Sequence, residues 1–258
     1  MILRGVFFSQ VLEMETNISI VAPDTISEQP LKVVYLLHGL CGRSGDWIDY
    51  TMLPSYAKQY SALFVMPEVA RSFYTNMQYG SNYLEYITNE LPAIVSSHFR
   101  VSPSSCDTAI IGASMGGYGA LKAALTKPAS YGFCGAFSSP CLMLKDDLAY
   151  TQGAQRFKEV FGERLYKDFQ AAFGENIDWH PSEDVVELAK ACHASAAPKL
   201  YLACGNNDMF LSDNKRFCAI LQDLGHNPTF NEWPGNHDWP FFDQALKHAL
   251  EQFFGGKY

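Results

Sequence analysis

The sequence Gly-Ala-Ser-Met-Gly at residues 112–116 constrains the fold of this chain more than any other feature. It directly follows the apolar run 108–111, and a helical pattern extends from Met115 to Thr126. Glycine at both ends of the pentapeptide permits a turn so tight that a side chain there would clash with neighbouring backbone. The pattern therefore predicts a buried strand, a sharp turn that projects the Ser114 hydroxyl above the sheet, and a helix.

Apolar runs alternate with helical periodicity along most of the 258 residues. Short, nearly continuous apolar runs predict buried strands at 31–37, 61–66, 107–111, 131–138, 199–204 and 229–233. An alternating pattern predicts a β-hairpin over 2–22 at one sheet edge. Further helices are expected at 84–95, with a bend at Pro92, at 212–224, with Ser212 as N-cap and Gly225 as stop, and at 242–253. The order predicts an α/β fold with a mostly parallel, doubly wound sheet.

Residues 142–197 interrupt this alternation. They are richer in charged residues and isolated aromatics, and only 185–192 show a clear helical period. We expect a helical, cap-like insertion that lies above the sheet, within a single domain formed by residues 1–258.

Composition excludes several classes of function. A net charge of −8 and a pI near 5.3 argue against a nucleic-acid partner, which needs a clustered basic face. The longest apolar stretches are too short for a membrane span, and the apolar N-terminus is too short for a signal peptide. Seven scattered cysteines indicate reduced thiols in a cytoplasmic protein, and no spacing typical of metal ligands occurs.

A serine hydroxyl becomes a nucleophile when a base takes its proton and a carboxylate orients that base. In α/β-hydrolases these groups follow in the order serine, acid, histidine. Asp208 comes just after the predicted strand 199–204, although an Asx turn would also explain it. His237 stands between the last predicted strand and helix, whereas Asp213 and Asp238 fall at helix starts, where capping explains them. We therefore predict a triad of Ser114, Asp208 and His237.

The tetrahedral intermediate of acyl transfer needs two backbone N–H donors. One is expected from Met115, the residue after the nucleophile. The other is expected from the loop after His38, with Leu40 as the first candidate and Cys41 as the second. His38 itself is interpreted as a brace of this loop.

Five motifs in this order resemble the esterase D-like family of esterases: Tyr-Leu-Leu-His-Gly-Leu at 35–40, Asp-Trp at 46–47, the block 79–92, Gly-Ala-Ser-Met-Gly-Gly at 112–117, and Gly-x-His-x-Trp at 235–239. That family includes bacterial tributyrin esterases, S-formylglutathione hydrolases, and some feruloyl and acetylxylan esterases. The resemblance is nearest to tributyrin esterases. It implies a cytoplasmic serine carboxylesterase that takes a small-molecule, short-chain acyl ester and uses no cofactor and no metal.

Two positions depart from the S-formylglutathione hydrolase branch. Those enzymes commonly have histidine before the serine, where this chain has Ala113. Their oxyanion loop usually has a threonine between the leucine and the cysteine, whereas Cys41 follows Leu40 directly in this chain. A thioesterase for S-formylglutathione and a feruloyl or acetylxylan esterase remain alternatives on the same triad. A non-catalytic binding protein with the same fold is the second rival.

Aromatic residues near the predicted strand ends are candidates for the pocket walls, although core packing explains each of them equally well. They are Trp47, Tyr79, Trp179 and Trp239. The sequence leaves open the acyl length, the natural alcohol and whether the chain forms a homo-oligomer.

Overall fold

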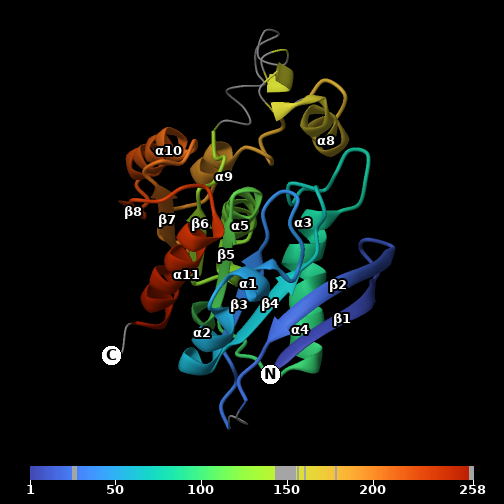
Figure 1. The fold of residues 1–258 in the computed structure, drawn as a ribbon, viewed down its shortest axis with the longest axis vertical. Coiled ribbons are helices and arrows are strands. Elements are labelled where there is room, and N and C mark those ends of the chain that lie inside the picture. Colours follow the sequence, from blue (N-terminus) through green and yellow to red (C-terminus); the bar gives the residue numbers. More distant parts are fainter. Residues whose placement is uncertain (25–27, 143–154, 156, 160, 178, 256–258) are drawn as a thin grey trace.

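The computed structural model describes residues 1–24, 28–142, 155, 157–159, 161–177 and 179–255. Within them, eight strands form one sheet in the order β1-β2-β4-β3-β5-β6-β7-β8 (Figure 1). The strands are β1 Ile2–Ser9, β2 Met14–Val21, β3 Val33–Leu37, β4 Leu63–Pro67, β5 Thr108–Ala113, β6 Phe133–Phe137, β7 Lys199–Gly205 and β8 Thr229–Trp233. The predicted strands are therefore present, with boundaries that differ by a few residues.

The predicted hairpin of β1 and β2 forms one edge of the sheet. β1 pairs antiparallel with β2, from Ile2 opposite Val21 to Ser9 opposite Met14, and β2 pairs antiparallel with β4. The remaining neighbours, from β4 through β3 and β5 to β8, run parallel. The predicted mostly parallel, doubly wound sheet is confirmed, and the carboxyl ends of its parallel strands meet at one edge.

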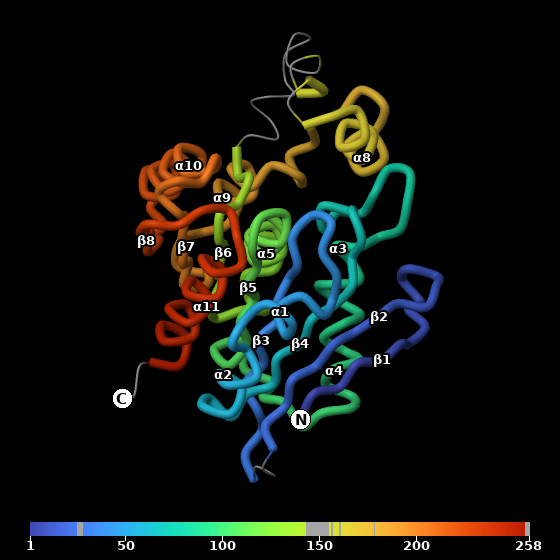
Figure 2. Tube along the Cα trace, viewed as in Figure 1, coloured from blue at the N-terminus to red at the C-terminus, as the bar shows by residue number. Residues whose placement is uncertain are grey.

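Helices cover both faces of the sheet (Figures 1 and 2). One face carries α1 Asp46–Tyr50, α2 Leu53–Tyr60 and α11 Trp239–Phe254. The other carries α3 Tyr83–Glu85, α4 Leu91–His98, α5 Met115–Thr126, α9 Val185–Ala191 and α10 Leu211–Asp223. Strand side chains alternate between the two cores: Val34 and Leu36 of β3 face α11, and Tyr35 and Leu37 face α5. Both cores are apolar, which explains the nearly continuous apolar runs.

Two helix predictions need correction. The helix expected over 84–95 contains a π-helical turn, Tyr86–Glu90, in which the Leu91 N–H donates to the Tyr86 carbonyl, and Pro92 directly follows this turn at the start of α4. α10 begins at Leu211 with Phe210 as its N-cap, so Ser212 lies inside the helix and does not cap it. Gly225 follows this helix with φ +84°, as expected of a stop.

The segment 142–197 is divided in the structure. α8 Glu163–Phe173 contacts the loop after β4 through the stacked rings of Phe73 and Phe169, whereas α9 packs against α5 and α10 and is part of the layer that covers the sheet. Residues 143–154, 156, 160 and 178 lie outside the described part of the chain. The cap-like role of the whole insertion stays a prediction.

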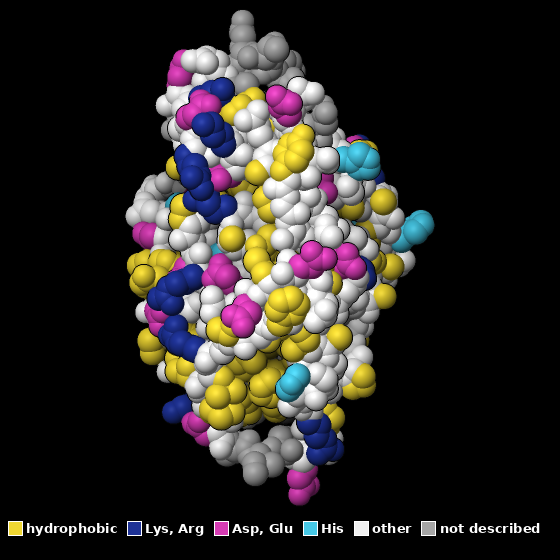
Figure 3. Space-filling model, turned by 90° about the vertical axis from the view of Figure 1, so that its right-hand side faces the viewer, with side chains coloured by type: hydrophobic (Ala, Val, Ile, Leu, Met, Phe, Trp, Pro, Cys, Tyr) yellow, Lys and Arg dark blue, Asp and Glu magenta, His cyan; other side chains and the backbone are white. Residues whose placement is uncertain are grey.

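The surface shows no separation of charge on the face drawn in Figure 3. Lys and Arg side chains there are interspersed with Asp and Glu side chains, so this face carries no large field of one sign. No helix in the described ranges has the length and apolar character that crossing a membrane requires.

Candidate active site

Ser114 occupies a strained turn between β5 and α5. Its backbone has φ 56° and ψ −123°, a conformation that non-glycine residues rarely adopt, and its N–H donates to the Phe137 carbonyl at 2.8 Å. A Cβ on Gly112 would lie 2.1 Å from the Gly116 oxygen, and one on Gly116 would lie 2.2 Å from the Leu37 oxygen. The two glycines are therefore required sterically, as the sequence predicted, and the serine side chain is held at the carboxyl end of the sheet.

Asp208 and His237 are brought together from two strand ends. Asp208 follows β7, His237 lies in the loop between β8 and α11, and His237 Nδ1 is 2.8 Å from Asp208 Oδ2. The Asp208 side chain is fully buried and also accepts a hydrogen bond from the Phe210 N–H at 2.9 Å. Burial alone would raise the pKa of Asp208, but the hydrogen bonds from His237 and Phe210 outweigh it and lower that pKa. The carboxylate therefore stays ionised and fixes the ring of His237.

The end of the histidine loop is held by the helix that follows. Asp238 is the N-cap of α11 and accepts a hydrogen bond from the Phe241 N–H at 3.1 Å, as expected of a helix-start residue. The rival acid Asp213 has a different environment, since its Oδ2 accepts from the Leu142 N–H at 2.9 Å.

Ser114 and His237 line the same cavity of about 580 Å³. Asp208 lies behind His237 and does not line it. The other lining residues come from the loop after β3, from α1, from the end of β5 and from the start of α11: Gly39, Leu40, Cys41, Gly42, Arg43, Asp46, Tyr50, Ala113, Asp238, Trp239 and Phe242. A small substrate in this cavity can contact a serine and a carboxylate-bound histidine at once.

The predicted oxyanion donors come from two elements, and one of them lines the cavity. Leu40 lines it from the loop after β3, and Met115 is the first residue of α5. A Cβ on Gly39 would lie 3.4 Å from the Ser114 Cβ, so this loop passes directly beside the serine. Within the described residues, the backbone N–H groups of Leu40 and Met115 donate to no protein acceptor. They are free to bind a ligand oxygen.

Of the four aromatic pocket candidates, the structure places only Trp239 in the cavity wall. Trp47 is fully buried, donates from Nε1 to the Leu37 carbonyl at 3.1 Å and contacts Trp239 edge-on, so it belongs to the core beneath the cavity. Tyr79 is exposed and borders a different surface depression with α8, and Trp179 packs against Phe173. These three side chains therefore do not line the cavity that contains Ser114, because chain position near a strand end does not fix the direction of a side chain.

Sequence reasoning missed Tyr50, whose ring stacks on Trp239 with centroids 5.2 Å apart. Its position three residues after Trp47 on α1 was the available signal, since residues at that spacing share a helix face. Sequence reasoning also missed Arg71. Its guanidinium donates to Cys41 Sγ at 2.7 Å and to Asp168 Oδ2 of α8 at 2.7 Å, so it links the loop beside the cavity to the segment 142–197.

The described ranges contain no group of three or more His, Cys, Asp or Glu side chains arranged to hold a metal ion. All seven cysteines lie in those ranges as free thiols, five of them buried.

Comparison with known proteins agrees with this geometry. The sequence model of a family described as "Putative esterase" matches residues 9–253. A curated relative, an acetyl esterase from Caldicellulosiruptor saccharolyticus, is 26% identical over 261 residues and covers 95% of each chain. Two solved structures from Staphylococcus aureus each cover 98% of both chains: the substrate-bound fluorophosphonate-binding serine hydrolase FphF, 27% identical with a TM-score of 0.85, and the S-formylglutathione hydrolase FrmB, 28% identical with a TM-score of 0.84.

Proposed function

This chain belongs to the putative esterase family, and from that premise we propose that it hydrolyses short-chain acyl esters through Ser114, His237 and Asp208. It has the α/β-hydrolase fold and is a serine hydrolase that acts on carboxylic ester bonds. The acyl length and the three named residues are our proposal.

The observation that carries the proposal is the 2.8 Å contact between His237 Nδ1 and Asp208 Oδ2 beside a cavity that Ser114 also lines. An ionised, buried carboxylate at Nδ1 keeps a proton on that nitrogen and leaves Nε2 as the base. In the proposed reaction, Nε2 takes the Ser114 proton as the oxygen attacks the ester carbonyl. The N–H groups of Leu40 and Met115 bind the oxyanion, and His237 then protonates the departing alcohol.

Deacylation repeats these steps with water. His237 takes a proton from the water molecule as its oxygen attacks the acyl carbon of the acyl-enzyme. Collapse of the second tetrahedral intermediate releases the acid and returns the proton to Ser114. The strained backbone of Ser114 supports this role, because it holds the hydroxyl at the open end of the sheet in both half-reactions.

The acetyl esterase among the relatives supports a small acyl group. A second candidate is thioester hydrolysis of S-formylglutathione, which the similarity to FrmB favours. Ala113 before the serine and the immediate succession of Leu40 and Cys41 depart from that branch, so we rank it second.

The test is a rate series on p-nitrophenyl acetate, butyrate, octanoate and decanoate, run beside Ser114→Ala and repeated on S-formylglutathione. We expect rapid hydrolysis of acetate and butyrate by the wild type and none above background by the variant. Equal, slow rates of both proteins on every ester would refute the assignment of Ser114. A wild-type preference for S-formylglutathione would replace the first candidate by the second.

Two further parts of the proposal concern the protein's setting. The free state of all seven cysteines supports a reducing compartment, and we place the protein in the cytoplasm.

The cap-like role of 142–197 is supported by Arg71, which contacts both Cys41 beside the cavity and Asp168 of α8. Loss of this link in Arg71→Met would then change the preference for acyl length in the same rate series.

A further inference from the structure

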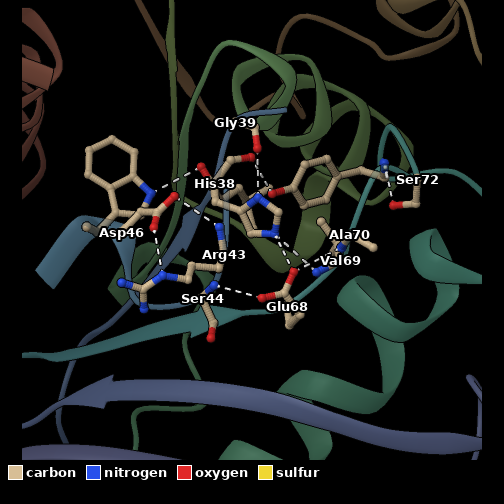
Figure 4. Close-up of polar contacts among 12 residues, drawn as sticks. His38, Gly39, Arg43, Ser44, Asp46, Glu68, Val69, Ala70 and Ser72 are labelled. Carbon is tan, nitrogen blue, oxygen red and sulfur yellow. Dashed lines mark hydrogen bonds and ion pairs between the residues drawn. The ribbon is translucent and has the colours of Figure 1, made fainter. Parts of the chain in front are cut away.

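A second histidine–carboxylate pair lies beneath the loop that carries Leu40 (Figure 4). His38 is 1% exposed, and its Nε2 lies 3.2 Å from Glu68 Oε1. Its other nitrogen, Nδ1, lies 2.8 Å from the carbonyl oxygen of Gly39. This pair does not line the cavity that contains Ser114, so it cannot exchange protons with a substrate there.

The partners of His38 require a proton on Nδ1. The Gly39 carbonyl can only accept a hydrogen bond, so an unprotonated Nδ1 would place two lone pairs against each other. Nε2 has both an acceptor, Glu68, and a donor, the Val69 N–H at 3.2 Å. A ring with protons on both nitrogens donates from Nδ1 to the Gly39 carbonyl and from Nε2 to Glu68. A ring protonated on Nδ1 alone keeps the bond to Gly39 and accepts from Val69, but its Nε2 lone pair then faces Glu68 Oε1.

This hydrogen bond fixes the direction of the Leu40 N–H. The Gly39 carbonyl and the Leu40 N–H belong to one planar trans peptide group and point in opposite directions. The carbonyl is held by His38 Nδ1 and by the Gly42 N–H at 3.1 Å. With the oxygen held on the protein side, the N–H points away from it.

Glu68 joins this loop to the end of β4. Its Oε2 accepts from the Ser44 N–H at 3.0 Å, and its Oε1 accepts from the Ala70 N–H at 3.1 Å. Partial burial would raise the pKa of Glu68, but the interaction with His38 and the two backbone donors outweigh it and lower that pKa. An ionised carboxylate therefore holds the His38 ring and the far end of the oxyanion loop.

The other contacts leave the loop little room to move. Tyr74 donates from its hydroxyl to the His38 carbonyl at 2.8 Å. A Cβ on Gly42 would lie 3.0 Å from the Gly39 oxygen and 3.2 Å from His38 Nδ1. The chain is packed closely around the carbonyl that His38 holds.

We propose that His38 and Glu68 are positioning residues that aim the Leu40 N–H at the oxyanion formed on Ser114. The inference rests on the function proposed above and assigns a task to two residues outside the triad. It parallels the pair of Asp208 and His237: one carboxylate–histidine pair orients the base, and the other orients a peptide group.

The test uses two substitutions that each keep one end of the imidazole. In His38→Asn the new amide nitrogen can take the place of Nδ1, and in His38→Gln the new amide nitrogen can take the place of Nε2. Removing an oxyanion donor costs about 100- to 1,000-fold in kcat, and a misdirected donor should cost less. We expect kcat on p-nitrophenyl acetate to fall about 10- to 100-fold in His38→Gln and about threefold in His38→Asn, with KM within about twofold of wild type in both.

Glu68→Gln removes the charge but keeps the size of the side chain. We expect kcat to fall by about tenfold, which is less than the loss of about 100- to 1,000-fold for removal of an oxyanion donor. Asp49→Glu, which keeps the exposed carboxylate near Arg43, is the control and should leave kcat unchanged. Affinity for phenylboronic acid, which forms a tetrahedral adduct with the serine, should weaken in each His38 and Glu68 variant by the same factor as kcat/KM. If His38 and Glu68 served folding alone, their variants would have lower melting temperatures, but the loss of boronic acid affinity would not match the loss of kcat/KM.

Equal kcat in His38→Asn and His38→Gln, losses confined to KM, or unchanged boronic acid affinity would overturn the inference. Ser114→Ala separates it from the proposed function. If that variant keeps full activity, the triad is wrong; if it is silent while the His38 and Glu68 variants equal wild type, only the positioning role fails.

Discussion

Gly116→Ala tests the steric basis of the site. Gly116 lies where α5 meets the end of β3, and an added Cβ would lie 2.2 Å from the Leu37 oxygen, 2.7 Å from the Leu37 carbonyl carbon and 2.8 Å from the His38 oxygen. All three contacts are backbone atoms, which cannot rotate away. Because heavy atoms in contact are separated by about 3.5 Å, α5 and β3 must move apart by about 1 Å.

This separation displaces Ser114 and Met115 relative to the loop that carries Leu40. A misplacement of about 1 Å in a catalytic site costs about 100-fold in rate, and we expect a fall of that size in kcat on p-nitrophenyl acetate. Overpacking should also lower the free energy of unfolding by about 1–3 kcal/mol, which for a domain of this size lowers the melting temperature by about 2–4 °C per kcal/mol.

The assay is steady-state kinetics with thermal unfolding of the same samples. The control is Gly5→Ala, because a Cβ there meets only Ile18 Cγ2, at 4.0 Å. It should leave kcat and the melting temperature near the wild-type values. A Gly116→Ala enzyme with kcat within about threefold of wild type would refute the argument that close packing of α5 on β3 sets the geometry of the site.

Asp208→Asn should lower kcat by about 10⁴-fold, because in a serine protease triad the same change leaves the histidine in the wrong tautomer. The Phe210 N–H keeps its acceptor. Steady-state kinetics would measure this, and a loss below about tenfold would contradict the role of Asp208. Lys122→Met should lower the free energy of unfolding in urea by about 3–5 kcal/mol, because it leaves Glu183 without its buried partner. The double variant Lys122→Met/Glu183→Gln should recover part of that loss. A double variant as unstable as the single one would argue against the ion pair as the cause. Burial lowers the pKa of Lys122 to about 8 from an ordinary 10.5, although Glu183 opposes the shift. Between these two pH values the unfolded chain holds a proton that the folded chain has lost. The free energy of unfolding of the wild type should therefore rise relative to that of Lys122→Met as the pH increases through this window. A constant difference between the two proteins would contradict the pKa shift.

Most of the fold could be predicted from local sequence patterns. The turn at Ser114 could be predicted because its geometry depends on a few adjacent residues: two glycines, a serine, a buried strand before and a helix after. The proximity of Asp208 and His237 could be predicted because the fold places the carboxyl ends of parallel strands at one edge, and chain order then restricts the candidates. The structure brings them to 2.8 Å of each other.

Predictions failed where a side chain's direction or a cap depended on neighbours from elsewhere in the chain. Trp47 could face the cavity or the core, and contact with Trp239 and Phe137 placed it in the core. Ser212 has the composition of an N-cap, yet α10 begins one residue before it. Helix ends and side-chain directions are set by packing energies as large as the local preferences that the sequence displays.

The sequence by itself determined the order of strands and helices along the chain and the strained turn at Ser114, because these follow from periodicity and from steric limits on adjacent residues. Only the tertiary structure decided that Glu68 meets His38, that Tyr50 stacks on Trp239, and that Arg71 joins Cys41 to Asp168. Each of these contacts joins residues from separate elements, and no local pattern fixes their distance. They form because the two layers of helices close on the sheet and bring side chains of matching charge or shape together.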